Sequence, residues 1–239
     1  MGAGGHTALR SDKGGRHTME RNQKKYDQLL RKIRPILVRH YGAELAESMI
    51  RDAAVIYEQF LTETPSIGGR KNPLNKNMDM ALPFFALYEA SGRTLSKDIV
   101  EEMTDQIIVA KYRKIGRWID LNKLDRPWFR RLMYSMVQKV ADKVNAHKGK
   151  DWNNTWGVEI NPEGYDHGLA MTLVGCPLAD FAKSHGYLEI LPYLCRSDIK
   201  AASALHARLI RHHTVSEGYA SCDYWYVGDQ EAPAESYGR

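Results

Sequence analysis

Apolar residues recur at helical spacing through the first two-thirds of the chain. Tyr, Leu and Ile residues three or four positions apart predict a first helix over 19–40, in which Pro35 should kink the helix or start a new one. The same spacing predicts a second helix over 43–62. The stretch 64–77 is dense in Gly, Pro and Asn and predicts a loop.

Further helical patterns follow this loop. A compact apolar segment, 78–92, predicts a helix that closes on a glycine suited to a C-cap. Ser96 suits the N-cap of the next helix, whose basic end at Lys111–Lys114 is favoured by the helix dipole. Pro127 suits the first turn of another helix. The stripe expected to be buried on that helix contains Phe129, Leu132, Met133, Met136, Val137, Val140 and Val144.

The pattern changes after His147, where alternation and turn-rich sequence replace helical spacing. Pro177 opens a short predicted helix, and another is predicted over 188–205. The predicted strands are 152–160, 169–174, 206–214 and 222–227. Helices followed by a small, mostly antiparallel sheet with two helices indicate an α+β fold.

These elements divide the chain into four regions. They are a disordered basic tail over 1–18, a helical region over 19–148, an α+β region over 149–228 that carries the site, and a polar tail over 229–239. A chain of 239 residues suits one large domain or two small ones. We expect the two middle regions to form one composite domain.

The positive charge is concentrated at the N-terminus. Of the formal net charge of +5, residues 1–40 contribute ten basic and three acidic side chains, a net +7, so the remainder carries −2. A basic arm can hold nucleic acid. This arm is Gly-rich and typical of a frayed terminus, so we do not expect a nucleic-acid partner.

Hydropathy and cysteine content narrow the cellular setting. No apolar run approaches the roughly 20 residues of a membrane-spanning helix, and residues 1–18 lack the hydrophobic stretch of a secretory signal. The three cysteines, Cys176, Cys195 and Cys222, are odd in number and form no CxxC pair. We therefore expect reduced thiols in a cytoplasmic protein that has no membrane partner.

Candidate chemistry gathers in the C-terminal third. Cys195 and Asp198 lie three apart on a predicted helix and therefore share one face. A carboxylate beside a thiol raises the thiol pKa, so this pair alone makes a weak thiolate. Cys176 ends a strand just before a helix, where N–H donors favour a thiolate. A small buried cysteine is the simpler interpretation of that residue.

The predicted hairpin carries a denser polar group, made of Arg211, His212, His213, Thr214, Cys222 and Asp223. If both arms are strands, Arg211 and His213 share one face, while His212 and Thr214 share the other. The cysteine and the aspartate likewise point to opposite faces. We expect part of this group to line a site.

A family resemblance appears at these residues. The chain reads Cys195-x-x-Asp198 and then Arg211-x-x-Thr214-x-x-x-Gly218-x-x-x-Cys222-Asp223-Tyr224. This pattern resembles the L-2-amino-thiazoline-4-carboxylic acid hydrolase family, in which phenylalanine usually replaces the tyrosine at the end of the motif. The apolar segment Phe84–Glu89 also resembles the family's N-terminal half.

The resemblance implies a hydrolase that adds water to a small cyclic amidine and opens the ring at its C–S bond. Cys195 or Cys222 would attack the amidine carbon, or hold a metal that activates water. Asp198 would hold the amidine and shuttle protons, while Arg211 would bind a carboxylate. His213, in preference to its neighbour His212, would protonate the departing sulfur. Further expected substrate-binding residues are Thr214, Asp223, Tyr88 and Glu89.

Two alternatives remain open. A metal-dependent enzyme would use as ligands Cys195, Asp198, Cys222 and His212. The cysteine route needs no cofactor and is favoured because standard zinc spacing is absent, although zinc is not excluded. A non-catalytic module for a small or metal-bearing ligand would resemble 4-vinyl-reductase-like domains and use the aromatic residues of the sheet. The apolar helices over 43–91 are numerous enough to offer a homo-oligomer face.

Overall fold

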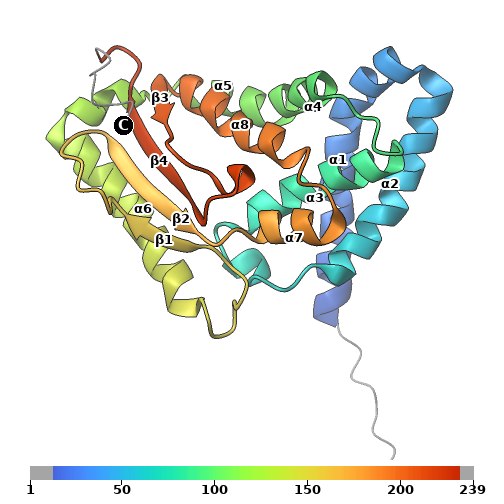
Figure 1. Cartoon of the computed structure of the whole chain (residues 1–239), viewed down its shortest axis with the longest axis horizontal. Coiled ribbons are helices and arrows are strands. Elements are labelled where there is room, and N and C mark those ends of the chain that lie inside the picture. The colour runs from blue at the N-terminus through green and yellow to red at the C-terminus, as the bar shows by residue number, and fades with distance from the viewer. Residues whose placement is uncertain (1–12, 232–239) are drawn as a thin grey trace, which may run out of the picture.

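Two long helices pack side by side at one end of the molecule (Figure 1). The structure is a computed structural model that describes residues 13–231, with side chains from Tyr26 onward. Helix α1 (Lys13–Tyr41) and helix α2 (Ala43–Glu63) are joined by a stacked pair of rings. The ring centroids of Tyr26 and Tyr57 lie 4.4 Å apart, so aromatic contact fixes the two helices against each other.

The N-terminal prediction needs two corrections. Pro35 lies inside α1 and starts no new helix. Residues 13–18, expected in a disordered tail, belong to α1, while residues 1–12 of that tail lie outside the described residues. The polar tail at the other end is described only over 229–231.

The middle of the chain is helical, as predicted. Helix α3 (Asn75–Ala90) is buried along most of its length. Helix α4 (Lys97–Thr104) continues through a π-helical turn (Asp105–Val109) into α5 (Ala110–Ile115). The single helix expected here is therefore interrupted by a π-turn, a feature that often marks functional sites.

Helix α6 (Pro127–His147) begins at the predicted proline, but only part of its apolar stripe is buried. Ala141 and Val144 are almost fully buried, whereas Leu132 and Met136 expose 50% and 54% of their surface. Part of the stripe therefore faces open space. Short 3-10 turns lie in the connections at Gly69–Lys71, Leu121–Asp125 and Val215–Glu217.

The C-terminal part forms a four-stranded sheet with two helices, α7 (Pro177–His185) and α8 (Leu191–Ser203). The strands are β1 (Gly157–Ile160), β2 (Leu169–Val174), β3 (Ala207–Ile210) and β4 (Ser221–Gly228). They lie in the order β1-β2-β4-β3, and every neighbouring pair is antiparallel. The predicted α+β class is confirmed.

The last hairpin differs from the sequence prediction. The strand expected over 206–214 ends at Ile210, because the carboxylate of Asp223 accepts the backbone N–H groups of His212 and His213. These bonds draw the chain around Asp223 and out of the ladder. The strict alternation expected across Arg211–Thr214 is therefore wrong.

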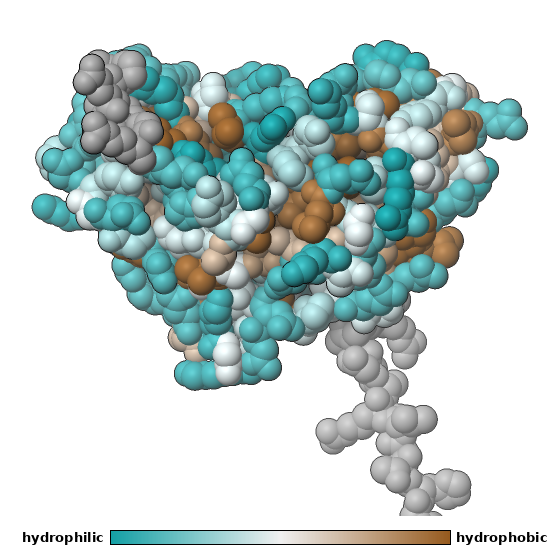
Figure 2. Space-filling model, viewed as in Figure 1, coloured by the Kyte–Doolittle hydropathy of each residue, from teal (hydrophilic) through white to brown (hydrophobic). Residues whose placement is uncertain are grey.

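Alternation along β2 and β4 gives the sheet two different faces. Met171, Leu173, Cys222, Tyr224 and Tyr226 lie on the face toward the helices, and the residues between them lie on the other face. Helix α6 and helix α8 lie along this sheet, while α3 lies in the centre of the molecule (Figure 1). Apolar side chains also show in the middle of the surface, between hydrophilic margins (Figure 2). Over the described residues, no helix has the length and apolar character to cross a membrane.

Candidate functional site

A cavity of about 430 Å³ lies between the helical face of the sheet and the surrounding helices. Its wall combines residues from α3, α6 and α8 with residues from the strands, so distant parts of the sequence build one chamber. The volume falls in the range of about 300–1,000 Å³ that is typical of ligand pockets. We refer to it as the inner cavity.

Three of the four predicted catalytic residues line the inner cavity. Cys195 and Asp198 reach it from α8, and Cys222 reaches it from β4. Asp198 borders the cavity and exposes 40% of its side-chain surface, while protein atoms surround the carboxyl densely. The predicted helix face carrying Cys195 and Asp198 is thus brought to the strand that carries Cys222.

Arg211 lies behind this wall and holds Asp198 in place. Its Nη2 donates to Asp198 Oδ2 at 3.0 Å, while Nε and Nη1 donate to the carbonyl oxygens of Asp223 and Cys195 at 3.2 and 3.3 Å. The guanidinium carbon lies 4.1 Å from the ring centroid of Tyr224, and the side chain is only 8% exposed. Because its donors point at protein groups, Arg211 acts on Asp198 more directly than on a ligand.

The carboxyl and thiol groups of the inner cavity all have raised pKa values. Burial raises the pKa of Asp198, although the Arg211 guanidinium and the Tyr224 hydroxyl, 3.2 Å from Oδ2, oppose the rise. Burial also raises the pKa of Cys195 to about 12, with Asp198 adding to the effect. At Cys222 burial raises the pKa as well, but the Val215 N–H, 3.2 Å from Sγ, and Arg211 favour its thiolate. The inner cavity therefore favours neutral acids.

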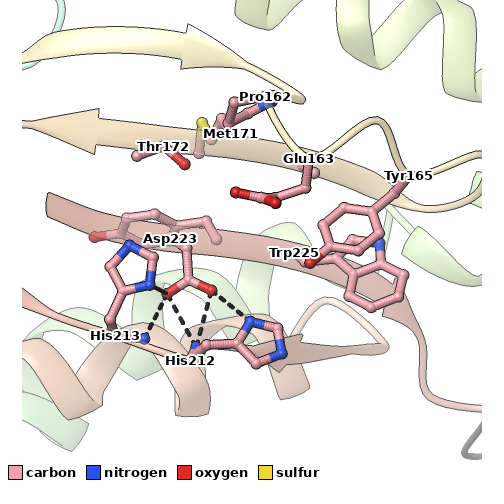
Figure 3. A pocket seen from close by; sticks show the side chains of 11 residues that line it. Pro162, Glu163, Tyr165, Met171, Thr172, His212, His213, Asp223 and Trp225 are labelled. Carbon is pink, nitrogen blue, oxygen red and sulfur yellow. Dashed lines mark hydrogen bonds and ion pairs between the residues drawn. The ribbon is translucent and has the colours of Figure 1, made fainter. Parts of the chain in front are cut away.

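A second, smaller pocket of about 180 Å³ lies on the opposite face of the sheet. Figure 3 shows His212 and His213 gathered around Asp223, with Glu163 across the pocket. Asp223 Oδ2 lies 2.8 Å from His212 Nδ1, and Oδ1 lies 2.8 Å from the His213 backbone nitrogen. His213 Nε2 also lies 3.1 Å from the hydroxyl of Ser221. The histidines are therefore separated from the thiols by the sheet.

The remaining predicted residues lie apart from both groups. Thr214 is buried in the turn and its hydroxyl donates to Glu217 at 2.9 Å. Gly218 ends that turn with φ 97°, a conformation suited to glycine. Tyr88 donates to Glu189, and Glu89 pairs with Arg93 at 3.0 Å, so the structure does not bring Tyr88 or Glu89 to the inner cavity.

The proposed metal ligands are divided by the same arrangement. Cys195, Asp198 and Cys222 border the inner cavity, whereas His212 borders the pocket on the other face. Among the side chains that the structure describes, those of residues 26–231, no group of three or more His, Cys, Asp or Glu is arranged to hold a metal ion. The four residues do not form one coordination site.

The wall contains further residues: Tyr112 and Lys76 had no predicted role, Cys176 was expected to be a simple buried cysteine, and the sheet aromatics Trp156 and Tyr226 were expected only in a binding module. Cys176 lines the inner cavity, where burial raises its thiol pKa to about 11, together with Tyr112, Tyr226, Trp156 and Lys76. The π-turn before Tyr112 contributes Ile108 to the wall, but it leaves no clear sequence pattern. Cys176 carried the one usable signal, a thiol at the junction of strand and helix.

Comparison with known proteins gives a family match. A model of a family described as L-2-amino-thiazoline-4-carboxylic acid hydrolase matches residues 75–226. The match contains α3, the first three strands, β4 as far as Tyr226, and all the sulfur and carboxyl groups of the inner cavity. None of the curated proteins and none of the solved structures compared with the chain matched it.

Proposed function

The chain belongs to the L-2-amino-thiazoline-4-carboxylic acid hydrolase family, and we propose that it opens a small cyclic amidine by cysteine-assisted hydrolysis. Family membership supports hydrolase activity in general. The finer proposal rests on one observation: Asp198 and Cys222, from separate elements of the family motif, line the same cavity, and Arg211 holds Asp198 there.

In this proposal Cys222 is the nucleophile. Its sulfur accepts the Val215 N–H and lies within the field of Arg211, and both interactions favour the thiolate that the attack requires. At Cys195 a hydrogen bond with Ser216 lowers the pKa, but burial and Asp198 outweigh it and raise the pKa to about 12. Cys222 is therefore the better nucleophile of the two candidates.

Asp198 acts as the proton donor and acceptor. Its raised pKa favours the protonated carboxyl, which can supply the departing sulfur with a proton. This role was expected for His213, but His213 borders the pocket on the other face of the sheet. Asp198 also offers two oxygens that match the paired nitrogens of an amidine.

The proposed reaction uses one water and leaves the enzyme unchanged. The Cys222 sulfur adds to the amidine carbon as an amidine nitrogen takes its proton, and the ring C–S bond breaks while Asp198 protonates the leaving sulfur. Water then adds to the same carbon and gives a proton to Asp198. The bond between carbon and Cys222 breaks, and the sulfur takes the proton of the new hydroxyl group as the carbonyl forms, while the nitrogen keeps the proton it received from Cys222. The product is an N-carbamoyl thiol, and no cofactor is required.

Paired serine variants test the nucleophile. With 2-aminothiazoline-4-carboxylate as substrate, Cys222→Ser should lower kcat/KM by about 100-fold or more, whereas Cys195→Ser should keep most of the activity. Acid-quenched wild-type enzyme should carry a substrate-derived mass on the peptide that contains Cys222. Retained turnover in both variants would overturn the proposal, and an adduct on Cys195 would transfer the role to that residue.

A binding module is the second candidate, because the inner cavity is mostly apolar and its thiols are held neutral. Such a module would bind amidines without releasing product. Mass spectrometry of incubations with saturating ligand separates the two candidates: a ring-opened product supports the hydrolase, and unchanged bound ligand supports the module. Elemental analysis of the pure protein tests the metal-dependent alternative.

A further inference from the structure

The inner cavity is larger than a single small ring requires. At about 430 Å³ it is of the size that encloses drug-sized ligands. A lone aminothiazoline with its carboxylate would leave most of the apolar wall in contact with water or empty space, which gains nothing from the hydrophobic effect. The cavity volume beyond that of one small ring indicates a larger ligand.

The wall is divided chemically. Asp198, Ser197 and the hydroxyl of Tyr224 lie at the end formed by α8 and β4. The side contributed by α6 and the part of α3 from Met80 to Phe84 are apolar instead, with Met80 and Val137 as examples, while Lys76 and Asn77 add polar groups at the start of α3. A ligand that matches both parts has one polar head and an apolar body.

The apolar side continues to the surface. Met136 lines the cavity and is also 54% exposed, so it lies at an opening beside α6. Met80, Met133 and Met171 line the cavity as well. Methionine side chains are flexible and polarisable, and they adapt to apolar groups of different shape. This lining suits a flexible chain better than a second rigid ring.

We propose that the substrate of this chain is amphipathic, with an amidine-containing head at Asp198 and an alkyl chain that lies against the methionines and leads out past Met136. The inference rests on the proposed function for the identity of the head. It extends that function by naming a substrate class with an apolar tail, which the single small ring lacks.

Binding of alkyl amidines tests the tail without requiring turnover. Acetamidine, hexanamidine and decanamidine are titrated into the full chain below their aggregation concentrations, and Kd is measured by calorimetry. Each buried methylene should lower Kd by about threefold to fourfold, the equivalent of about 0.8 kcal/mol. Equal Kd values across the series would overturn the inference.

Matched variants on one helix locate the chain. Met136→Ser should reduce the gain in affinity per methylene, because it removes an apolar group from the opening. Leu132→Ser is the control, since Leu132 is 50% exposed on the same helix but lies outside the cavity wall. An equal loss in both variants would assign the affinity to the outer surface and overturn the inference.

Turnover separates this inference from the proposed function. If the serine variants of Cys195 and Cys222 both hydrolyse the ring normally, the catalytic proposal fails, while a chain-length dependence sensitive to Met136→Ser still supports the tail. If Cys222→Ser is inactive and the chain-length dependence is absent, the catalytic proposal stands and the amphipathic substrate is wrong.

Discussion

The two faces of the four-stranded sheet carry different chemistry, although one strand supplies both. From β4, Cys222 and Tyr224 face the inner cavity, while Asp223 and Trp225 face the smaller pocket. The adjacent residues of the Cys222-Asp223-Tyr224 motif therefore cannot act on the same ligand group. This short motif therefore supplies the proposed nucleophile to one face of the sheet and a carboxylate that binds backbone N–H groups to the other.

The two carboxyl groups show the contrast most clearly. Burial raises the pKa of Asp198 on the inner side. On the outer side burial opposes ionisation of Asp223 too, but hydrogen bonds from the His213 and His212 N–H groups hold its pKa below the ordinary value. A carboxyl with a raised pKa suits acid catalysis, and one with a lowered pKa suits a structural anchor.

The largest effect is expected from Asp198→Asn. The amide can still bind an amidine but cannot deliver a proton, so kcat should fall by about 100-fold to 10,000-fold. Steady-state kinetics measure the loss, and circular dichroism checks that the fold is retained. Asp223→Asn is the matched control on the other face, and an equal loss of kcat there would break the proposed division.

Asp223→Asn should instead lower stability. It replaces a carboxylate that accepts two backbone N–H groups and the His212 ring, and we expect a loss of about 1–3 kcal/mol in the free energy of unfolding. Because the folded pKa of Asp223 is lowered, its contribution is present above the ordinary carboxyl pKa and is lost as pH falls through the folded value. Urea unfolding at several pH values should show a weaker acid dependence in the variant. An unchanged acid dependence would contradict the anchor role.

The fold was largely predictable because its elements follow local patterns. Strand β2 has the predicted bounds, and α6 starts at the predicted proline. The end of β3 at Ile210 was not predictable, since it depends on the carboxylate of Asp223 on another strand. Met136 was predicted to be buried because it lies in the apolar stripe of α6, but it borders the inner cavity and is 54% exposed. Apolar periodicity identifies a helix face but does not tell a packed core from the wall of a cavity.

The site was predictable only in part. Spacing placed Cys195 and Asp198 on one helix face, and both line the inner cavity. The sequence could not show that the N–H groups of Arg211 donate hydrogen bonds to protein oxygens. The prediction also assumed a regular strand at His213. This residue, which was expected to act as an acid, was therefore placed on the wrong face of the sheet.

Tyr224→Phe restores the residue usual in the family and should have a modest effect. It removes the hydroxyl that donates to Asp198 and lowers its pKa, so the pKa of Asp198 should rise further. In the proposed mechanism activity requires the protonated carboxyl, so the decline of activity toward alkaline pH should shift to higher pH. Tyr226→Phe, a change on the same face without a described bond to Asp198, should leave the profile unmoved. A shift toward lower pH in Tyr224→Phe would contradict the acid role of Asp198.

The smallest effect is expected from Cys176→Ala. Cys176 borders the same cavity as Cys222 but lies outside the family motif, and burial raises its pKa to about 11. No polar contact to Asp198 or Arg211 depends on it among the described residues, so kcat/KM should stay within about threefold of wild type. Comparing its kcat/KM with that of Cys222→Ser shows whether activity depends on Cys222 itself or on any thiol that lines the cavity. If Cys176→Ala is as inactive as Cys222→Ser, the inner face acts through a pair of thiols, and the assignment of a single nucleophile is wrong.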